Sequence, residues 1–136
     1  METSCGVVLV NFGQILLLQY PQGHWDFPKG HVEESDQNRI QTARRELQEE
    51  TGISEIEFVE GFEDRTSYAF HHKGKKIEKQ VFWYVALTDE LDVHLSSEHL
   101  QHIWLDWDAA EDLMSHEESR TVLLAAREFL RRKGIE

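Results

Sequence analysis

The sequence is poor in cysteine, in long apolar runs and in positive charge. Its single cysteine, Cys5, excludes an internal disulfide and is typical of a reducing compartment. No apolar run approaches the roughly 20 residues of a membrane-spanning helix, and the first residues lack the basic flank and cleavage signal of a secretory peptide. We therefore expect a cytoplasmic location and no membrane partner.

The charge balance is strongly acidic, with 14 Lys and Arg against 26 Asp and Glu and a net charge of −12. Phosphate backbones are bound by basic patches, so this balance argues against a nucleic-acid partner. A small-molecule polyphosphate is compatible with it if metal ions and a few local cations supply positive charge. The chain contains no repeat or linker, and its length predicts one domain, residues 1–136. The oligomeric state is left open.

The acidic residues concentrate in the segment Arg45–Ile53, which reads RELQEETGI. In a helix, Glu46, Glu49 and Glu50 fall within an arc of about 100°. Like charges at this spacing repel, so we expect the cluster to bind a positively charged ligand. Oxygen ligands on one rigid element suit Mg²⁺, with Mn²⁺ possible. A solvated acidic face is the alternative interpretation of the three glutamates alone.

Neighbouring residues favour the metal interpretation. The residues Ile40, Ala43 and Leu47 form a separate apolar stripe, so the carboxylates do not face the core. Arg45 precedes Glu49 by four residues and can orient its carboxylate; an ordinary helix ion pair is the alternative.

Gly30 followed by the segment Arg45–Ile53 resembles the Nudix box, the signature of hydrolases that cleave nucleoside diphosphates linked to another group. The second half of the box matches at every specified position. The first half has one extra residue, so Asp36 or Gln37 stands in for its first glutamate. We expect the extra residue between Val32 and Asn38, because inside the helix it would rotate the glutamates by about 100°. Asp36 would then cap the helix or pair with Arg45.

The resemblance covers roughly Ser4 to Lys133 and implies an α/β (α+β) fold, a Nudix-like α/β/α sandwich with a mixed β-sheet flanked by helices. It implies a hydrolase in which metal-activated water attacks phosphorus. The expected catalytic residues are Glu49, Glu46 and Arg45, with the identity of the general base left open. The expected metal ligands are Glu46, Glu49, Glu50, the Gly30 carbonyl and, from a later loop, Glu98. For Glu98 an exposed loop acid is the alternative.

The run Trp25–His31 (WDFPKGH) resembles the diadenosine tetraphosphate hydrolases within this family, as does Glu98-His99 followed by Ile103–Leu105. This subgroup implies a nucleotide substrate, a dinucleoside polyphosphate cleaved asymmetrically to ATP and AMP. The alternatives are an RNA 5′-pyrophosphohydrolase, a nucleotide-sanitising Nudix pyrophosphatase, a non-catalytic nucleotide-binding domain and an acidic interaction domain. The intact glutamates argue against the non-catalytic domain.

The residues expected to bind substrate are Lys29, His31, Lys79, Trp83 and Tyr84. In a strand, Phe82 and Tyr84 point to one face and Trp83 to the other. We favour Trp83 as the ring that stacks on adenine; core packing is the alternative for either face. The lysines at 73, 75 and 76 are expected to form a solvated hairpin tip.

Hydrophobic periodicity and turn residues predict the remaining elements. The expected strands are Ser4–Val10, Gln14–Gln19, a short one near Trp25–Phe27, Ile56–Glu63, Arg65–His72, Lys79–Leu87 and Ile103–Leu105. The first expected helix runs from about Asp36 to Thr51 and is capped by Ser35 or Asp36. A short helix starts at Asp108, which forms a capping box with Glu111, and the last helix runs from about Ser119 to Lys133.

Overall fold

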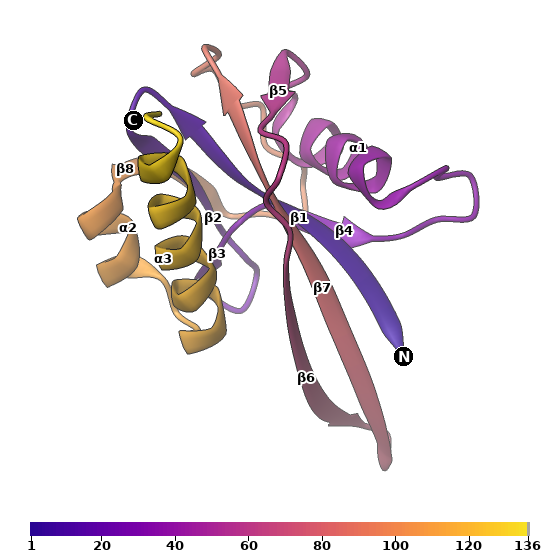
Figure 1. Cartoon of the computed structure of the whole chain (residues 1–136). Helices are drawn as coiled ribbons and strands as arrows, with labels where there is room; N and C mark the ends of the chain where they lie inside the picture. The colour runs from indigo at the N-terminus through magenta and orange to yellow at the C-terminus, as the bar shows by residue number, and fades with distance from the viewer. Residues whose placement is uncertain (136) are drawn as a thin grey trace.

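The computed structural model describes residues 1–135 and contains one mixed eight-stranded sheet and three helices (Figure 1). The strands are β1 (Glu2–Asn11), β2 (Gln14–Gln19), β3 (Trp25–Asp26), β4 (Lys29–His31), β5 (Ile56–Phe58), β6 (Asp64–His72), β7 (Lys75–Thr88) and β8 (Gln101–Asp106). The helices are α1 (Arg39–Thr51), α2 (Trp107–Leu113) and α3 (Glu117–Arg132). The mixed α+β class expected from the sequence is confirmed.

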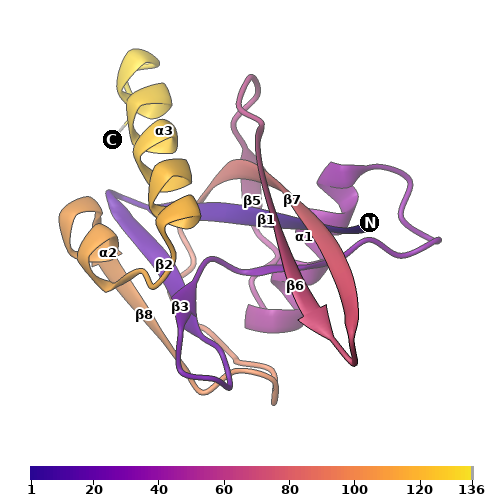
Figure 2. The same ribbon diagram turned by 90° about the horizontal axis from the view of Figure 1, so that it is seen from below.

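The sheet is organised around β1 and β7, which run parallel from the pair Glu2–Lys79 to the pair Val10–Leu87. β2 and β4 pair with β1 in the antiparallel sense, while β5 and β6 pair with β7. The β6–β7 hairpin turns at Lys73-Gly74, where both residues have positive φ. Its outer end extends past the start of β1 and projects from the body of the molecule (Figures 1 and 2).

Helices cover both faces of the sheet, with α1 on one face and α2 and α3 on the other (Figure 2). The three consecutive leucines of β2, residues 16–18, are fully buried because each face has its own hydrophobic cluster. The apolar face predicted for α3 is also confirmed, since Leu123, Ala126 and Leu130 are all buried. Among residues 1–135, no helix is long and apolar enough to span a bilayer.

The start of α1 differs from the prediction. The helix begins at Arg39 rather than near Asp36, and its N-cap is Asn38, whose Oδ1 accepts from the Gln41 N–H at 2.8 Å. Neither Ser35 nor Asp36 caps it. From Arg39 to its C-terminal glycine the helix is unbroken, so the extra residue lies before it, as predicted.

Other boundaries also differ from the prediction, with β7 starting at Lys75 rather than Lys79. β5 ends at Phe58 instead of Glu63, and a turn follows in which Gly61 has φ of 105°. α2 begins at Trp107, because Asp106 rather than Asp108 accepts from the Ala109 N–H, at 2.8 Å. The short β4 strand was not predicted.

Candidate active site

A glycine allows the acidic helix α1 to approach the strand beneath it. Gly30 of β4 pairs with Cys5 of β1. A Cβ atom at Gly30 would collide with the carboxylate of Glu46. The absence of a side chain at this position therefore brings two of the expected metal-ligand residues together.

Arg45 holds the acidic cluster in place. Its Nη1 donates to Glu46 Oε1 at 2.9 Å and to Glu49 Oε2 at 3.1 Å. Its Nε and Nη2 each donate to one carboxylate oxygen of Asp36 at 3.0 Å, and Nη2 also donates to the His31 carbonyl at 2.8 Å. The guanidinium holds the pKa of the Asp36 carboxyl well below its usual range. Of the two alternatives for Asp36, pairing with Arg45 is confirmed.

Glu50 is the most enclosed glutamate of the cluster, with 5% of its surface exposed. Its Oε1 accepts from the Lys29 backbone N–H at 3.0 Å. Burial and then the negative charge of Glu46 raise the pKa of Glu50 to about 8. A buried carboxylate is costly without a compensating positive charge, so this position suits a cation.

A loop before β8 adds a fourth carboxylate. Backbone hydrogen bonds from His94 to Thr51 (2.8 Å) and from Ser96 to Glu50 (3.1 Å) fasten this loop to the end of α1. Glu98 on the loop lines the same cavity as the glutamates of α1. The residues expected as metal ligands, Glu46, Glu49, Glu50, Gly30 and Glu98, are thus all brought to one cavity.

The cavity has a volume of about 870 Å³ and also presents positive charge. Three of the expected substrate-binding residues, Lys29, His31 and Lys79, line it. The Lys29 ammonium lies 4.3 Å from the centre of the Tyr20 ring and 3.5 Å from Asp26 Oδ2. Burial and the charge of Lys29 lower the pKa of Lys79. Two lysines in one cavity favour an anionic ligand, which would offset their mutual repulsion.

The donor set of this cavity fits a hard divalent cation, because all its expected ligands offer oxygen. Within residues 1–135, however, no three ligand side chains already converge on one point. In this arrangement the Arg45 guanidinium holds one oxygen of Glu46 and one of Glu49.

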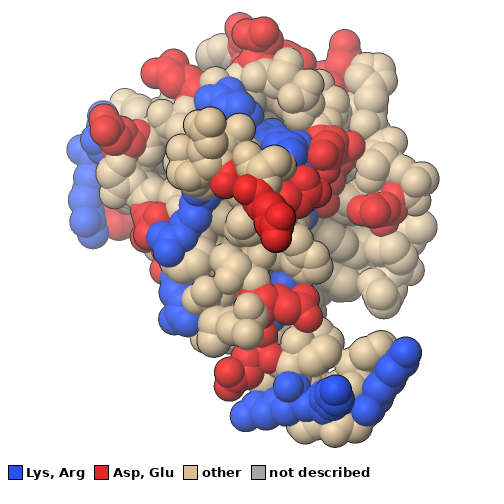
Figure 3. Space-filling model, turned by 90° about the vertical axis from the view of Figure 1, so that its right-hand side faces the viewer, with Lys and Arg blue, Asp and Glu red and all other residues tan. Residues whose placement is uncertain are grey.

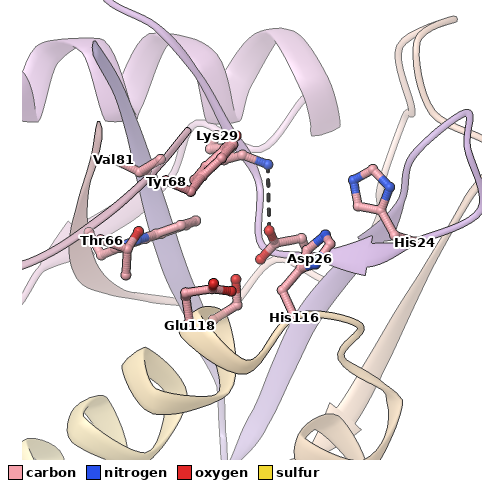
Figure 4. Close-up of a pocket in the computed structure, with 10 residues that line it drawn as sticks. His24, Asp26, Lys29, Thr66, Tyr68, Val81, His116 and Glu118 are labelled. Carbon is pink, nitrogen blue, oxygen red and sulfur yellow. Dashed lines mark hydrogen bonds and ion pairs between the residues drawn. The ribbon is translucent and has the colours of Figure 1, made fainter. Parts of the chain in front are cut away.

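A second cavity of about 270 Å³ adjoins the first, and His24, Lys29 and Tyr68 line both. Figure 4 shows Tyr68 and Lys29 on one side of it, with Glu118 facing them from the start of α3. The apolar wall is formed by Val81 and Trp83. This arrangement gives a partly apolar recess beside a charged cavity.

The structure corrects the expected positions of Trp83 and Tyr84. Trp83 is 1% exposed, packs edge-on against Phe27 and donates its indole N–H to Thr66 Oγ1 at 2.9 Å. Its ring faces are enclosed, so it forms a wall of the recess rather than a stacking platform. Tyr84 lies on the opposite face of the sheet, where its hydroxyl donates to Glu63 at 2.6 Å. It lines neither cavity.

Tyr68 is an exposed aromatic residue that lines both cavities, and sequence reasoning missed it. It is 42% exposed and lies directly across β6–β7 from Lys79. The signal was present in the sequence: a two-residue turn at Lys73-Gly74 places residue 68 opposite residue 79.

The hairpin lysines lie apart from this site. The residues Lys73, Lys75 and Lys76 are exposed at the turn between β6 and β7. Figure 3 shows the Lys and Arg side chains gathered at this projecting end, below a more acidic body. They form the solvated tip that the sequence predicted.

Comparison with known proteins agrees with this geometry. The NUDIX domain family model matches residues 2–126. The chain is 38% identical over 122 residues to the rat (Rattus norvegicus) bis(5′-nucleosyl)-tetraphosphatase [asymmetrical], covering 86% of this chain and 80% of that protein. It is 34% identical over 98 residues to the RNA pyrophosphohydrolase of Caulobacter vibrioides, covering 65% of this chain and 55% of that protein.

Solved structures show the same relationship. The structure of a Caenorhabditis elegans Ap4A hydrolase binary complex matches with a TM-score of 0.83 and 28% identity, covering 96% of this chain and 98% of that chain. The Nudix-like arrangement of sheet and helices is thereby confirmed. On the family match and on relatives at this identity, the chain belongs to the Nudix family.

Proposed function

We propose that this protein is a metal-dependent Nudix hydrolase that cleaves dinucleoside polyphosphates asymmetrically, diadenosine tetraphosphate to ATP and AMP. The observation that carries the proposal is the pairing of two adjoining cavities. One contains the glutamates of α1 together with Lys29 and Lys79, and the other is a recess beside Tyr68. A polyphosphate with a nucleoside at its end matches this pairing. Relatives named for asymmetric tetraphosphatase activity cover most of the chain and support it.

The residues that would hold a divalent cation, Mg²⁺ or Mn²⁺, are Glu46, Glu49, Glu50 and Glu98, with the Gly30 carbonyl. When bound, such a cation neutralises phosphate charge and lowers the pKa of the attacking water. Positive charge also stabilises the buried Glu50 carboxylate, whose pKa of about 8 reflects its burial.

The other side chains bind and orient. Lys29 and Lys79 hold the phosphate oxygens that metal ions leave uncovered. Glu49, whose side chain is 56% exposed, is the best placed of the glutamates to accept a proton from water. Arg45 acts as a positioning residue, because its guanidinium fixes Glu46 and Glu49 and does not line the cavity.

In the cleavage step, the water oxygen bonds to the phosphorus fourth from the adenosine held in the recess. The bond between that phosphorus and the oxygen bridging it to the third phosphorus breaks. ATP leaves with the bridging oxygen, and AMP carries the oxygen of water.

RNA 5′-pyrophosphohydrolase activity is the second candidate, favoured by the 34% identity to the Caulobacter enzyme. The chain spans about half the length of that enzyme, against four fifths of the rat tetraphosphatase. The dinucleoside polyphosphate is therefore the better supported substrate.

A substrate panel tests the proposal. Purified protein is incubated with Mg²⁺ and, separately, with diadenosine tetraphosphate, ATP and a 5′-triphosphorylated RNA, and the products are separated by chromatography. We expect the highest kcat/KM for the dinucleotide. Glu50→Gln should lower kcat by orders of magnitude, whereas Glu34→Gln, at an exposed loop position, should not. Activity confined to ATP or to the RNA end would contradict the proposal.

A further inference from the structure

We propose that His99 is a positioning residue for Glu50, and that the hydroxyl of Ser96 fixes the imidazole tautomer this role requires. The inference rests on the proposed function in one respect, namely that Glu50 is a metal ligand. It concerns residues outside the helical signature, on the loop that carries Glu98.

The first observation is that the His99 imidazole is buried and its Nε2 has no hydrogen-bond partner. Its side chain is 1% exposed. Leaving a buried polar atom unpaired is costly, so a structure that retains one is expected to use it.

The second observation is the direction in which this nitrogen points. His99 Nε2 lies 3.6 Å from Glu50 Oε2, in a region where the Glu50 side chain is only 7% exposed. Most N–H···O hydrogen bonds are about 2.7–3.2 Å long, and contacts of this kind commonly tighten when an active site is loaded.

The tautomer follows from the contacts of Ser96. Its Oγ lies 3.1 Å from His99 Nδ1 and also accepts from the Glu98 N–H at 3.4 Å. A hydroxyl has one proton and two lone pairs, so Oγ can accept from Glu98 and donate to Nδ1 at the same time, and it must donate when Nε2 carries the ring proton toward a carboxylate, which only accepts. Nδ1 is then the acceptor, and the neutral ring carries its proton on Nε2, facing Glu50.

Polar groups therefore lie beside both oxygens of Glu50. The Lys29 N–H donates to Oε1 at 3.0 Å, and His99 faces Oε2. The imidazole itself is fixed by an edge-on contact with Tyr20, with ring centres 4.7 Å apart. A ligand carboxylate held in this way is pre-oriented for its metal, and loss of such an outer partner typically costs about 10–100-fold in metal affinity.

Binding of Mn²⁺ alone, without substrate, tests the inference. Free Mn²⁺ is measured by electron paramagnetic resonance during titration of the whole protein. We expect His99→Ala to raise the Mn²⁺ Kd by about 10–100-fold. His99→Gln places an amide N–H near the position of Nε2, so its Kd should stay close to that of the wild type. His94→Gln, an exposed histidine on the same loop, is the matched control and should leave the Kd unchanged.

Ser96→Ala tests the tautomer. It should raise the Mn²⁺ Kd in the wild-type background but not in the His99→Gln background, because an amide has no tautomer to fix. An increase in both backgrounds would show that Ser96 acts by another route and would overturn that part of the proposal. These two variants also keep the test valid if His99→Ala does not fold.

The outcomes separate this inference from the proposed function. Equal weakening by His99→Ala and His99→Gln, or no weakening by either, would overturn the role of His99 while wild-type Mn²⁺ binding stood. A folded wild-type protein that binds no Mn²⁺ would overturn both.

Discussion

Arg45 is the residue on which the acidic cluster depends. Carboxylates three and four residues apart on a helix repel, and the guanidinium lies between Glu46 and Glu49 while anchoring on Asp36. Its planar fork matches two carboxylate oxygens at once, which a lysine ammonium cannot do. The cluster can therefore persist in a folded protein before any cation binds.

Tyr68 is predicted to stack on the base of the substrate. Base–aromatic stacking is worth about 1–3 kcal/mol, so Tyr68→Ala should raise KM for diadenosine tetraphosphate by about 5- to 150-fold, with a smaller change in kcat. Steady-state kinetics measures this. Tyr84→Phe, on the far face of the sheet, is the control and should leave KM unchanged. An effect of Tyr84→Phe equal to that of Tyr68→Ala would contradict the assignment.

Glu50 predicts how the stability of the metal-free protein depends on pH. Its pKa is raised from 4.5 to about 8 in the folded state, mainly by burial. The native state then binds a proton more tightly than the unfolded state, so this contribution is present below pH 4.5 and is lost as the pH rises through about 8.

In EDTA, the free energy of unfolding of the wild type should therefore fall more between pH 6 and pH 9 than that of Glu50→Gln, which cannot ionise. Urea denaturation at both pH values measures the difference. If the free energy of unfolding fell equally with pH in the two proteins, the pKa of Glu50 would not be raised in the folded state.

At the residue scale, the sequence predicted the cluster but not the surroundings of each side chain. Glu46, Glu49 and Glu50 share a face because helix geometry alone decides it. The enclosure of Trp83 depends on Phe27, from the loop between β3 and β4, and on Thr66 of β6, so alternation along β7 could not reveal it. The same limit applies to His99, whose burial follows from the docking of its loop on α1.

At the scale of elements, the segment between β4 and α1 absorbs the extra residue without moving the glutamates. Asp36 folds back, with Oδ2 accepting from the Glu33 N–H at 2.9 Å and from the Thr42 hydroxyl at 2.8 Å. Asn38 caps the helix instead. The sequence predicted Ser35 or Asp36 as the cap, whereas the Asp36 carboxylate is bound by Arg45.

A matched pair of substitutions tests this assignment. Asn38→Ala should lower the free energy of unfolding by about 1 kcal/mol, because it removes the side-chain acceptor of the first turn. Ser35→Ala, at the cap position suggested by the sequence, should change it by less than about 0.5 kcal/mol. Chemical denaturation measures both, and a larger effect at Ser35 would contradict the observed helix start.

At the scale of the whole molecule, the sheet joins two halves of the site. α1 brings the glutamates and β4 brings Gly30 and Lys29, while β6 and β7 bring Tyr68 and Lys79. The parallel pairing of β1 with β7 was not predicted, because it joins residues about 77 apart and no local pattern specifies a partner at that distance. The strands and helices themselves follow local periodicity and were largely predicted.

Metal should stabilise the whole fold. A cation that binds only the folded cluster adds about 2.7 kcal/mol at a concentration 100 times its Kd, which raises Tm by several degrees. Thermal unfolding with and without millimolar Mg²⁺ measures this shift. The Mg²⁺-induced Tm shift should be smaller in Glu50→Gln and unchanged in Glu34→Gln. A Tm that Mg²⁺ does not change in the wild type would contradict a metal site at this cluster.

The position of the oxygen from water tests the central claim most directly. Diadenosine tetraphosphate is hydrolysed in ¹⁸O-labelled water with Mg²⁺, and the products are analysed by mass spectrometry. Attack on the phosphorus fourth from the adenosine held in the recess predicts ATP and AMP in equal amounts, with ¹⁸O only in AMP. Two molecules of ADP, or label in ATP, would contradict the account.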